Sequence, residues 1–346
     1  MALITNESLL AINAELERKN RLLMRFANKY ARTSWLDLRN KVRGGTIAEY
    51  LVVGDILLTT YAFNGTEYEM PWLVVNINRE VEWEDGTKHP GLFLLSEGST
   101  IQDVEFDAAE NNVVDLELEP NALAGWYYWG QNGNQQTRLN VNTGDQLPTN
   151  YSKIVKCMFD KGTVLNSGLC IWEDSAVRQW LNSGANRGEW WEPQHSGDLE
   201  PSTLSIYDGF MFGLDPDFLN VLTPIKVKTA IPSFAGGGTS VTLDTFFLPS
   251  VEELYGIPET PNVEGPFLPY FKEVTGFTTP SNTDTDGRAA HPLNSSNRIS
   301  FFTRSASEST CYVYAVNSKG AIKNEFTNYI STPSNRKHQR VMCAIS

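Results

Sequence analysis

The segment formed by residues 172–193 constrains the fold most, because it gathers four of the nine tryptophans around one short helical pattern. Asp174 or Ser175 can begin a helix, since a short side-chain oxygen accepts hydrogen bonds from the free N–H groups of the first turn. Apolar residues at positions i, i+3 and i+4 then share one helix face: Val177, Trp180 and Leu181. The segment therefore predicts a short buried helix followed by an irregular aromatic stretch.

Most of the remaining chain has the pattern of strands and loops. Stretches rich in β-branched and aromatic residues are separated by turn signals, of which Asn64-Gly65 and Asp85-Gly86 are the clearest. The predicted strands are residues 50–60, 72–78, 91–96, 299–304, 310–317 and 339–345. Residues 323–338 are predicted to form a long polar loop. These patterns together predict an α+β protein.

Two further short helices are predicted from their capping residues. Asp215 is a good N-cap residue, and Pro216 suits the first helical position because its missing N–H would be unpaired there anyway. In the second helix, Ser250 and Glu253 have the spacing of a capping box, and Gly256 is placed to end the helix.

Changes of pattern along the chain predict three parts. Residues 1–45 form a helical arm, residues 46–150 form a β-rich domain, and residues 151–346 form a second domain that contains the tryptophan-rich segment. In the arm, residues 6–32 are predicted to be helical. Their apolar residues follow heptad spacing: Leu9, Ile12, Leu16, Leu23, Phe26 and Tyr30.

Charge is divided unevenly between the arm and the rest of the chain. The whole chain carries a net charge of −13, yet residues 1–43 contain nine basic and four acidic residues. A basic arm on an acidic body suggests that the arm has a partner of its own. Two interpretations remain open: an oligomerising or docking arm, and an amphipathic helix that lies on its own domain. The acidic body argues against a nucleic-acid partner.

Composition excludes several other classes. The four cysteines are too few and too widely spaced for a disulfide scaffold, and none forms a pair with zinc-site spacing. No apolar run approaches the length of a membrane span, so we expect no membrane partner. The N-terminal residues lack the apolar core of a signal peptide, which predicts a protein that folds in the cytoplasm.

No motif indicates catalysis or a cofactor. The four histidines are scattered, and no nucleophile elbow, phosphate loop or dinucleotide fingerprint is present. Several acidic residues lie close together in sequence, but a solvated acidic surface explains them equally well: Glu173, Asp174, Glu189, Glu192 and Asp198. We expect no catalytic residues, no cofactor and no metal. Asp284 and Asp286 copy the start of a calcium loop, although its twelfth position is Leu293, so a polar turn and a calcium site both stay open.

Ligand-binding residues are predicted at the C-terminal end of the chain. A long loop held by a rigid sheet is a common place for recognition, and its composition suits adaptable polar contacts. The candidate residues are Tyr312, Tyr314, Asn328, Tyr329, Asn335 and Arg336. The aromatic residues 126–129 and Trp190-Trp191 could also stack on sugar rings, although core or interface packing is the commoner use of such residues.

Five blocks in the second half of the chain resemble a bacterial and phage family of unassigned function. In that family a helix with the pattern S-x-x-R-x-W-L-N precedes an F-L-P-S-x-x-E element, an R-S strand and a closing strand. The blocks are, in order, WEDSAVRQWLNS, DTFFLPSVEELYG, ISFFTRSASE, CYVYAVNSKGAI and RVMCAIS. The resemblance covers about residues 150–346 and implies a C-type-lectin-like fold, which variable receptor-binding phage proteins and formylglycine-generating enzymes also have. Residues 301–304, Phe-Phe-Thr-Arg, depart from the usual Trp-Leu-Arg.

The whole chain resembles virion proteins of tailed phages that infect gut bacteria. Those proteins join a short helical arm and a Val-Gly-Asp strand, here Val53-Gly54-Asp55, to such a domain, and the segments that begin at Arg187 and Gly209 strengthen the match. The resemblance implies a non-enzymatic structural protein, a head fibre or capsid decoration, that folds in the host cytoplasm and is located in the virion.

The resemblance also implies partners and alternatives. The expected partners are phage capsid or tail proteins, further copies of the chain in a homotrimer, and a host-surface glycan or protein. A tail-associated receptor-binding protein is the first alternative. The second is an enzyme on the formylglycine-generating-enzyme-like fold, in which Cys311 and Cys343 would be the candidate thiols.

Overall fold

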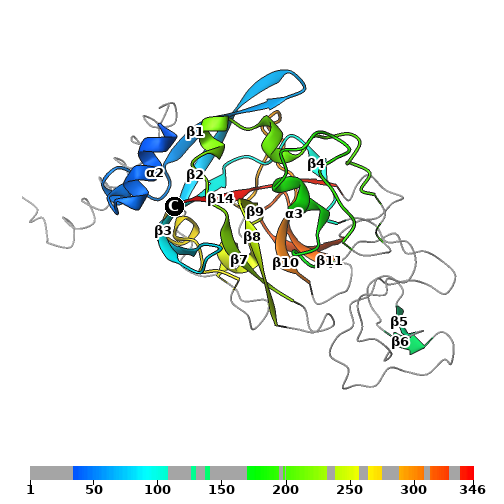
Figure 1. The fold of residues 1–346 in the computed structure, drawn as a ribbon. Helices are drawn as coiled ribbons and strands as arrows, with labels where there is room; N and C mark the ends of the chain where they lie inside the picture. Colours follow the sequence, from blue (N-terminus) through cyan, green and yellow to red (C-terminus); the bar gives the residue numbers. More distant parts are fainter. Residues whose placement is uncertain are drawn as a thin grey trace, which may run out of the picture.

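The computed structural model shows a mixed helix-and-sheet protein in which sheet predominates (Figure 1). This composition is compatible with the predicted α+β class. The described residues are 34–107, 126–129, 137–140, 170–194, 198, 200–231, 238–256, 264–274, 288–307, 312–326 and 336–346. The predicted arm helix, residues 6–32 with its six heptad positions, lies outside them. None of the helices in the described ranges is long and apolar enough to cross a membrane.

A five-stranded antiparallel sheet forms the centre of the molecule, with the order β1-β2-β3-β14-β9. Its strands are β1 (Ile56–Phe63), β2 (Thr66–Glu82), β3 (Lys88–Ser96), β14 (Met342–Ile345) and β9 (Phe246–Phe247). Strand β14 therefore lies between β3 and β9, pairing with one on each side. The boundary predicted at residue 150 does not separate two sheets, because strands from both sides of it pair directly.

The two turns predicted from Asn-Gly and Asp-Gly are confirmed. Asn64 and Gly65 connect β1 to β2 with φ angles of 49° and 76°, so both central residues have the positive φ of a type I′ turn. Gly86, in the turn between β2 and β3, has a φ of 83°. The long β2–β3 hairpin also contains two register shifts, one of them beside Asn78, whose φ is 62°.

The described residues also form smaller sheets. One has the order β10-β11-β12, with strands β10 (Phe301–Ala306), β11 (Tyr312–Val316) and β12 (Ile322–Phe326). The other pairs are β7 (Ile225–Ala230) with β8 (Thr239–Asp244), β13 (Lys337–His338) with β4 (Asp103–Val104), and β5 (Trp126–Trp129) with β6 (Thr137–Asn140).

The polar loop predicted at residues 323–338 is partly wrong. Strand β12 occupies its beginning and pairs with β11 over five residues, and β13 occupies part of its end. The polar composition of β12, Ile-Lys-Asn-Glu-Phe, suits an edge strand in which residues 322–325 are all partly or fully exposed. Pairing with β11 therefore decides the structure of this segment, and local polarity does not.

The helices are short, and their ends match the capping residues. They are α2 (Trp35–Arg43), α3 (Ala176–Leu181), α4 (Pro216–Leu219) and α5 (Val251–Tyr255), together with the 3-10 helices η1 (Ile47–Glu49) and η2 (Phe210–Gly213) and the π-helical turn η4 (Tyr270–Val274). Of the two candidates for α3, Ser175 is the N-cap, and its hydroxyl accepts from Arg178 N. Asp215 caps α4, and the complete capping box of Ser250 and Glu253 caps α5.

Helix α2 belongs to the body, so the predicted arm of residues 1–45 is too long. Trp35, Leu38 and Val42 are buried, and the ring of Trp35 lies 4.5 Å from that of Phe218. Arg43 Nε donates to the carbonyl oxygen of Ser346 at 3.2 Å. The basic charge of this helix suggested that it was part of the arm, but its apolar positions at i, i+3 and i+7 attach it to the core.

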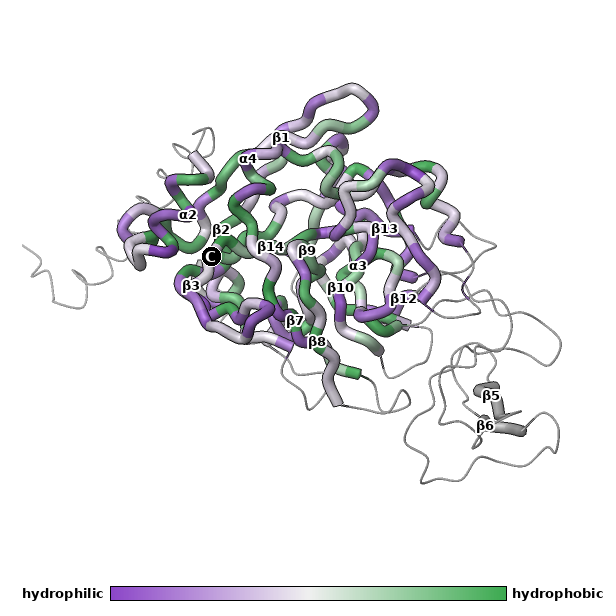
Figure 2. Tube along the Cα trace, in the orientation of Figure 1, coloured by the Kyte–Doolittle hydropathy of each residue, from purple (hydrophilic) through white to green (hydrophobic). Residues whose placement is uncertain are grey.

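One hydrophobic core contains side chains from both predicted domains. At its centre the ring of Trp72 on β2 packs against Phe218 and Phe246, and Phe246 in turn packs against Phe210, which contacts Trp180 of α3. Figure 2 shows hydrophobic residues in β2 and β9, two strands of the central sheet. Trp180 and Leu181 are both fully buried, which confirms the predicted core face of α3.

Leu181→Ala should lower the free energy of unfolding by about 2–5 kcal/mol, because the buried side chain leaves a cavity in a packed core. The measurement is urea unfolding followed by fluorescence and circular dichroism. Leu36 of α2 is a matched control, since it is 54% exposed. Leu36→Ala should change stability by less than about 0.5 kcal/mol. Equal effects of the two substitutions would contradict the core position of α3.

Candidate functional site

The described part of the predicted ligand surface lies on β11 and at Arg336, directly before β13. Tyr312 and Tyr314 are half-buried and alternate with the buried residues Val313 and Ala315, so the tyrosines occupy the more exposed face of β11. Their neighbours across the sheet are Phe326 and Asn324 of β12. Three other predicted ligand residues lie outside the described ranges: Asn328, Tyr329 and Asn335.

Arg336 is held by contacts within the protein. Its Nη2 donates to the Ser202 hydroxyl at 2.7 Å, and its Nε lies 3.5 Å from Oε1 of the buried Glu105. Glu105 also accepts hydrogen bonds from the hydroxyls of Ser202 and Thr203. These contacts join the chain around β13 to the segment that follows β4. Arg336 therefore positions the C-terminal segment, in addition to any contact with a ligand.

The acidic residues weighed as catalytic candidates are distributed over the surface. Glu173, Glu189 and Glu192 are exposed, and Asp174 and Asp198 are half-buried. Although Glu173 is exposed as a residue, partial desolvation of its carboxyl group, with a smaller contribution from neighbouring Asp174, raises its pKa. Asp198 Oδ2 accepts from Gln194 N at 2.6 Å, and Glu189 accepts from Asn186, so these carboxylates contribute to local loop structure.

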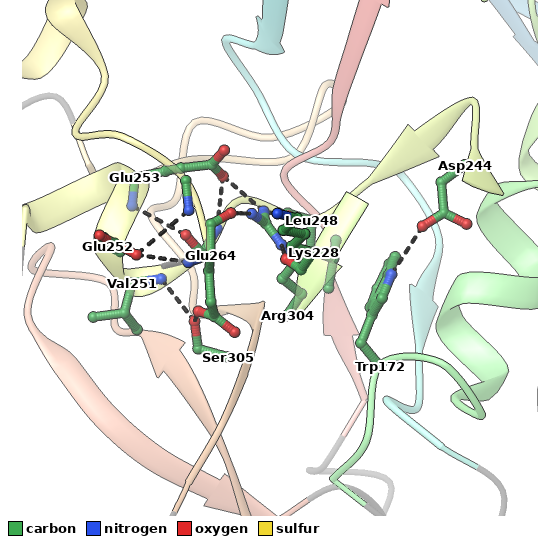
Figure 3. Close-up of polar contacts among 12 residues, drawn as sticks. Trp172, Lys228, Asp244, Leu248, Val251, Glu252, Glu253, Glu264, Arg304 and Ser305 are labelled. Atoms are coloured by element: carbon green, nitrogen blue, oxygen red, sulfur yellow. Dashed lines mark hydrogen bonds and ion pairs between the residues drawn. The ribbon is translucent and has the colours of Figure 1, made fainter. Parts of the chain in front are cut away.

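A buried charge network lies where β2, α5 and β10 meet (Figure 3). Glu253 of α5 is fully buried and accepts from two arginines: Arg304 Nη1 at 2.6 Å and Arg79 Nη1 at 2.9 Å. It also accepts from Ser250 N at 3.1 Å as part of the capping box. We call Glu253, Arg304, Arg79 and Glu264 the Glu253 network.

The remaining donors of Arg304 hold the surrounding backbone. Its Nη1 donates to Leu248 O at 2.7 Å, and its Nη2 donates to Glu264 O at 2.5 Å. The carboxylate of Glu264 accepts from Ala230 N at 3.0 Å and from the Ser305 hydroxyl. Arg304 is thus a buried guanidinium whose donors are used on three neighbouring segments, as its fork of N–H groups allows.

Burial and ion pairing shift the two glutamates in opposite directions. Burial alone would raise the pKa of Glu253, but Arg304 and Arg79 outweigh it and hold this pKa below its ordinary value. For Glu264, burial outweighs the attraction of Arg304 and raises the pKa. Burial opposes the charge on Arg304, and the neighbouring carboxylates, Glu253 first, overcome that effect and raise its pKa.

A cavity of about 840 Å³ lies beside the Glu253 network, and all four residues of the network line this cavity. Two carboxylates with oppositely shifted pKa values at a cavity resemble an acid–base pair. However, both oxygens of Glu253 and both oxygens of Glu264 already accept hydrogen bonds from the protein. The arrangement is therefore suited to holding β2, α5 and β10 together.

A second set of buried contacts explains the pattern S-x-x-R-x-W-L-N. Arg178 Nε donates to Oδ1 of the buried Asp244 at 2.7 Å, and the indole N–H of Trp172 donates to Oδ2 at 2.9 Å. Asn182 Oδ1 accepts from Phe246 N at 3.0 Å, while its Nδ2 donates to Phe246 O at 2.8 Å. These polar residues attach α3 to β8 and β9.

The sequence analysis did not predict which residues form ion pairs with the buried motif residues. The capping role of Glu253 is confirmed, but its arginine partners were not predicted. A signal existed in the strand Phe-Phe-Thr-Arg-Ser-Ala, since an arginine within an apolar strand requires a buried acidic partner. That signal indicates a partner without indicating which of the many acidic residues it is.

Neither described cysteine is placed for thiol chemistry. Cys343 lies within β14 and Cys170 precedes α3, and both side chains are buried. Burial raises the pKa of the Cys343 thiol, which disfavours the reactive thiolate. Cys311 lies outside the described residues, as do Asp284 and Asp286 of the candidate calcium loop. Among the residues that the structure does describe, no group of three or more His, Cys, Asp or Glu side chains could hold a metal ion.

Glu253→Gln should lower the free energy of unfolding by about 3–5 kcal/mol, because it leaves the buried Arg304 guanidinium without its charged partner. Urea unfolding at pH 7 measures the loss. The control is Glu80→Gln, which removes one partner of a surface pair whose side chains are 59% and 62% exposed. The control should leave the unfolding midpoint unchanged. An unchanged midpoint for Glu253→Gln would show that the network does not hold the fold.

The same network predicts a response to acid. Because the pKa of Glu253 is lowered in the folded protein, its contribution to stability is complete above the ordinary value of about 4.3 and is lost as pH falls through the folded-state pKa. The raised pKa of Glu264 has the opposite effect on stability. Its contribution to stability is present at low pH and is lost as pH rises through the folded-state pKa of Glu264. Stability of Glu253→Gln should therefore fall less steeply than that of the parent between about pH 5 and about pH 2. Parallel pH profiles would contradict this expectation.

The profile of a protein family described as a domain of unknown function, DUF6273, matches residues 159–345. No curated protein and no solved structure matches the chain. The matched residues include α3, the Glu253 network apart from Arg79, and the central strand β14. Because this match spans more than half of the sequence, the chain belongs to the DUF6273 family.

Proposed function

We propose that this chain is a non-enzymatic structural protein of a tailed-phage particle, a head fibre or capsid decoration that displays a lectin-like domain. The sequence resemblance supports the phage context. The observation that carries the non-enzymatic part is the use of the motif residues. Arg178, Asn182, Glu253 and Arg304 are all engaged in contacts within the protein, so the motifs build a scaffold. A scaffold of this kind supports recognition by its surface loops.

The attachment of α2 supports a role for the preceding residues as an anchor. Its buried side chains fix the start of the body, and Arg39 Nη1 donates to Asn220 O at 2.9 Å. Three of the basic residues counted for the arm therefore belong to the body. Residues 1–33 still contain six basic and three acidic residues, so their charge remains opposite to that of the rest of the chain. This charge contrast and the heptad pattern favour attachment of the segment to a particle or to other copies of the chain.

The enzyme alternative is supported by one observation, the cavity beside the Glu253 network. Two observations weigh against it. The carboxylate oxygens at that cavity already accept hydrogen bonds from the protein, and the Cys343 thiol is buried in the central sheet. A binding role therefore fits the described residues better. The position of the protein on purified particles, on the head or on the tail, distinguishes a head fibre or capsid decoration from a tail-associated protein.

Deletion of residues 2–33 should leave a folded body that neither trimerises nor enters particles. The deletion retains Trp35, Leu38 and Val42, so the thermal unfolding temperature should stay close to that of the parent. Light scattering measures the oligomeric state. Complementation of a phage that lacks the gene, with immunogold labelling of purified particles, measures incorporation and shows whether the label lies on the head or the tail.

A longer deletion, of residues 2–43, serves as the control. It removes the three buried side chains of α2 and should destabilise the body, which separates loss of attachment from loss of folding. Normal trimerisation and incorporation of the shorter deletion variant would contradict the anchoring role. Absence of the parent protein from mature particles would contradict the proposed function itself.

A further inference from the structure

A second cavity lies beside the tip of the β1–β2 hairpin, away from the Glu253 network. It has a volume of about 500 Å³, within the range of roughly 300–1,000 Å³ that small-molecule sites occupy. Its walls come from four places: the hairpin around Phe63, Gln102, the loop at Asn186 and Arg187, and the segment 208–213. We call it the hairpin pocket. Arg187 and Gly209, which begin two of the segments that strengthen the phage resemblance, line it.

Close backbone contacts and hydrogen bonds build the walls of the hairpin pocket. A Cβ atom on Gly213 would lie 2.3 Å from Ala62 O, and one on Gly209 would lie 2.4 Å from Ser183 O, so only glycine allows these approaches. Asp208 Oδ1 accepts from Arg187 N at 2.8 Å, and Asp208 O accepts from the Trp180 indole at 2.9 Å. These contacts fix the shape of the pocket before any ligand arrives.

A buried amide in the pocket has an unused polar atom. Gln102 is 2% exposed, and its Nε2 lies 2.5 Å from the Tyr61 hydroxyl. Its Oε1 has no hydrogen-bond partner among the described residues. Turning the amide over would exchange its two ends and leave Nε2 unpaired, so one polar atom stays free in either orientation. A buried polar group without a partner costs about 1–3 kcal/mol, which a polar ligand would recover.

The other groups of the pocket define the chemistry of that ligand. Two phenylalanines line the pocket: Phe212, which is 55% exposed, and the half-buried Phe63. The charges of Arg187 and Asp208 compensate each other, with Arg187 Nε 3.5 Å from Asp208 Oδ1. Burial raises the pKa of Tyr61, so its phenol stays neutral. The pocket therefore combines apolar faces, hydrogen-bonding groups and no net charge.

We propose that the hairpin pocket binds a neutral saccharide. A sugar ring has an apolar face that can stack on the exposed ring of Phe212, and hydroxyl groups that can donate to the amide oxygen of Gln102. This inference deepens the proposed display function and rests on it only for the biological source of the saccharide, a host surface. The hairpin pocket uses other residues than the predicted C-terminal ligand surface at Tyr312, Tyr314 and Arg336.

The test uses the purified full-length protein on an array of neutral, sulfated and sialylated oligosaccharides. Isothermal titration with the best-bound neutral oligosaccharide then gives the affinity. We expect binding to neutral saccharides, and a loss of about tenfold or more in affinity for Phe212→Ala, since stacking on one ring contributes on the order of tenfold. Gln102→Leu should also weaken binding, with thermal unfolding as the check that this buried variant still folds.

Tyr50→Ala is the matched control, because Tyr50 is an aromatic residue of similar exposure, 56%, that does not line the pocket. It should bind as the parent does. Failure to bind any neutral saccharide at millimolar concentration would overturn the proposal, and so would parental affinity in Phe212→Ala. Either result would leave the particle location unaffected. If the protein binds saccharides but is absent from particles, the display function is overturned, and the proposal that the hairpin pocket binds a saccharide still stands.

Discussion

The fold depends on one buried carboxylate, that of Glu253. Its partner Arg79 is 174 residues away in the sequence and its partner Arg304 is 51 residues away, so a single side chain connects the first hairpins to the last sheet. A buried charge without its partners would cost several kcal/mol, which makes each of these segments necessary to the others. Gly265 approaches so closely that a Cβ atom there would lie 2.5 Å from Glu253 Oε1, and a larger residue would disturb the carboxylate. The network therefore explains why a polar group is retained at the junction of β2, α5 and β10.

Features that depend on neighbouring residues were predictable from the sequence. Asn64-Gly65 forms its turn because both residues accept positive φ, and Ser250 with Glu253 forms its capping box because the two are three residues apart. The burial of Trp180 and Leu181 follows from helical spacing in the same way. Each of these predictions rests on geometry that a few consecutive residues determine.

Features that depend on distant pairing were not predictable. Nothing in the segment of β14 shows that it enters the sheet between β3 and β9, and nothing in the polar β12 shows that β11 will pair with it. The partners of Arg304 and the unpaired amide oxygen of Gln102 were not predictable for the same reason, because the groups that surround them come from separate segments. Of the candidate ligand residues, sequence composition identified half-buried positions on the more exposed face of β11 but gave no signal for the hairpin pocket. A single glutamine in an irregular segment has no pattern to distinguish it.

The position of β14 has a consequence for the order of events during synthesis. The backbone N–H of Val341, which leads into β14, donates to the Ser96 hydroxyl, and these residues are 245 positions apart. At about 5–20 residues per second, the ribosome needs roughly 10–50 s to pass from one to the other. During that time the edge of β3 that later receives β14 lacks its partner, and exposed strand edges are prone to pair with other chains. A nascent chain of this architecture is therefore a natural client for chaperones that cover strand edges until residues 342–345 have been made.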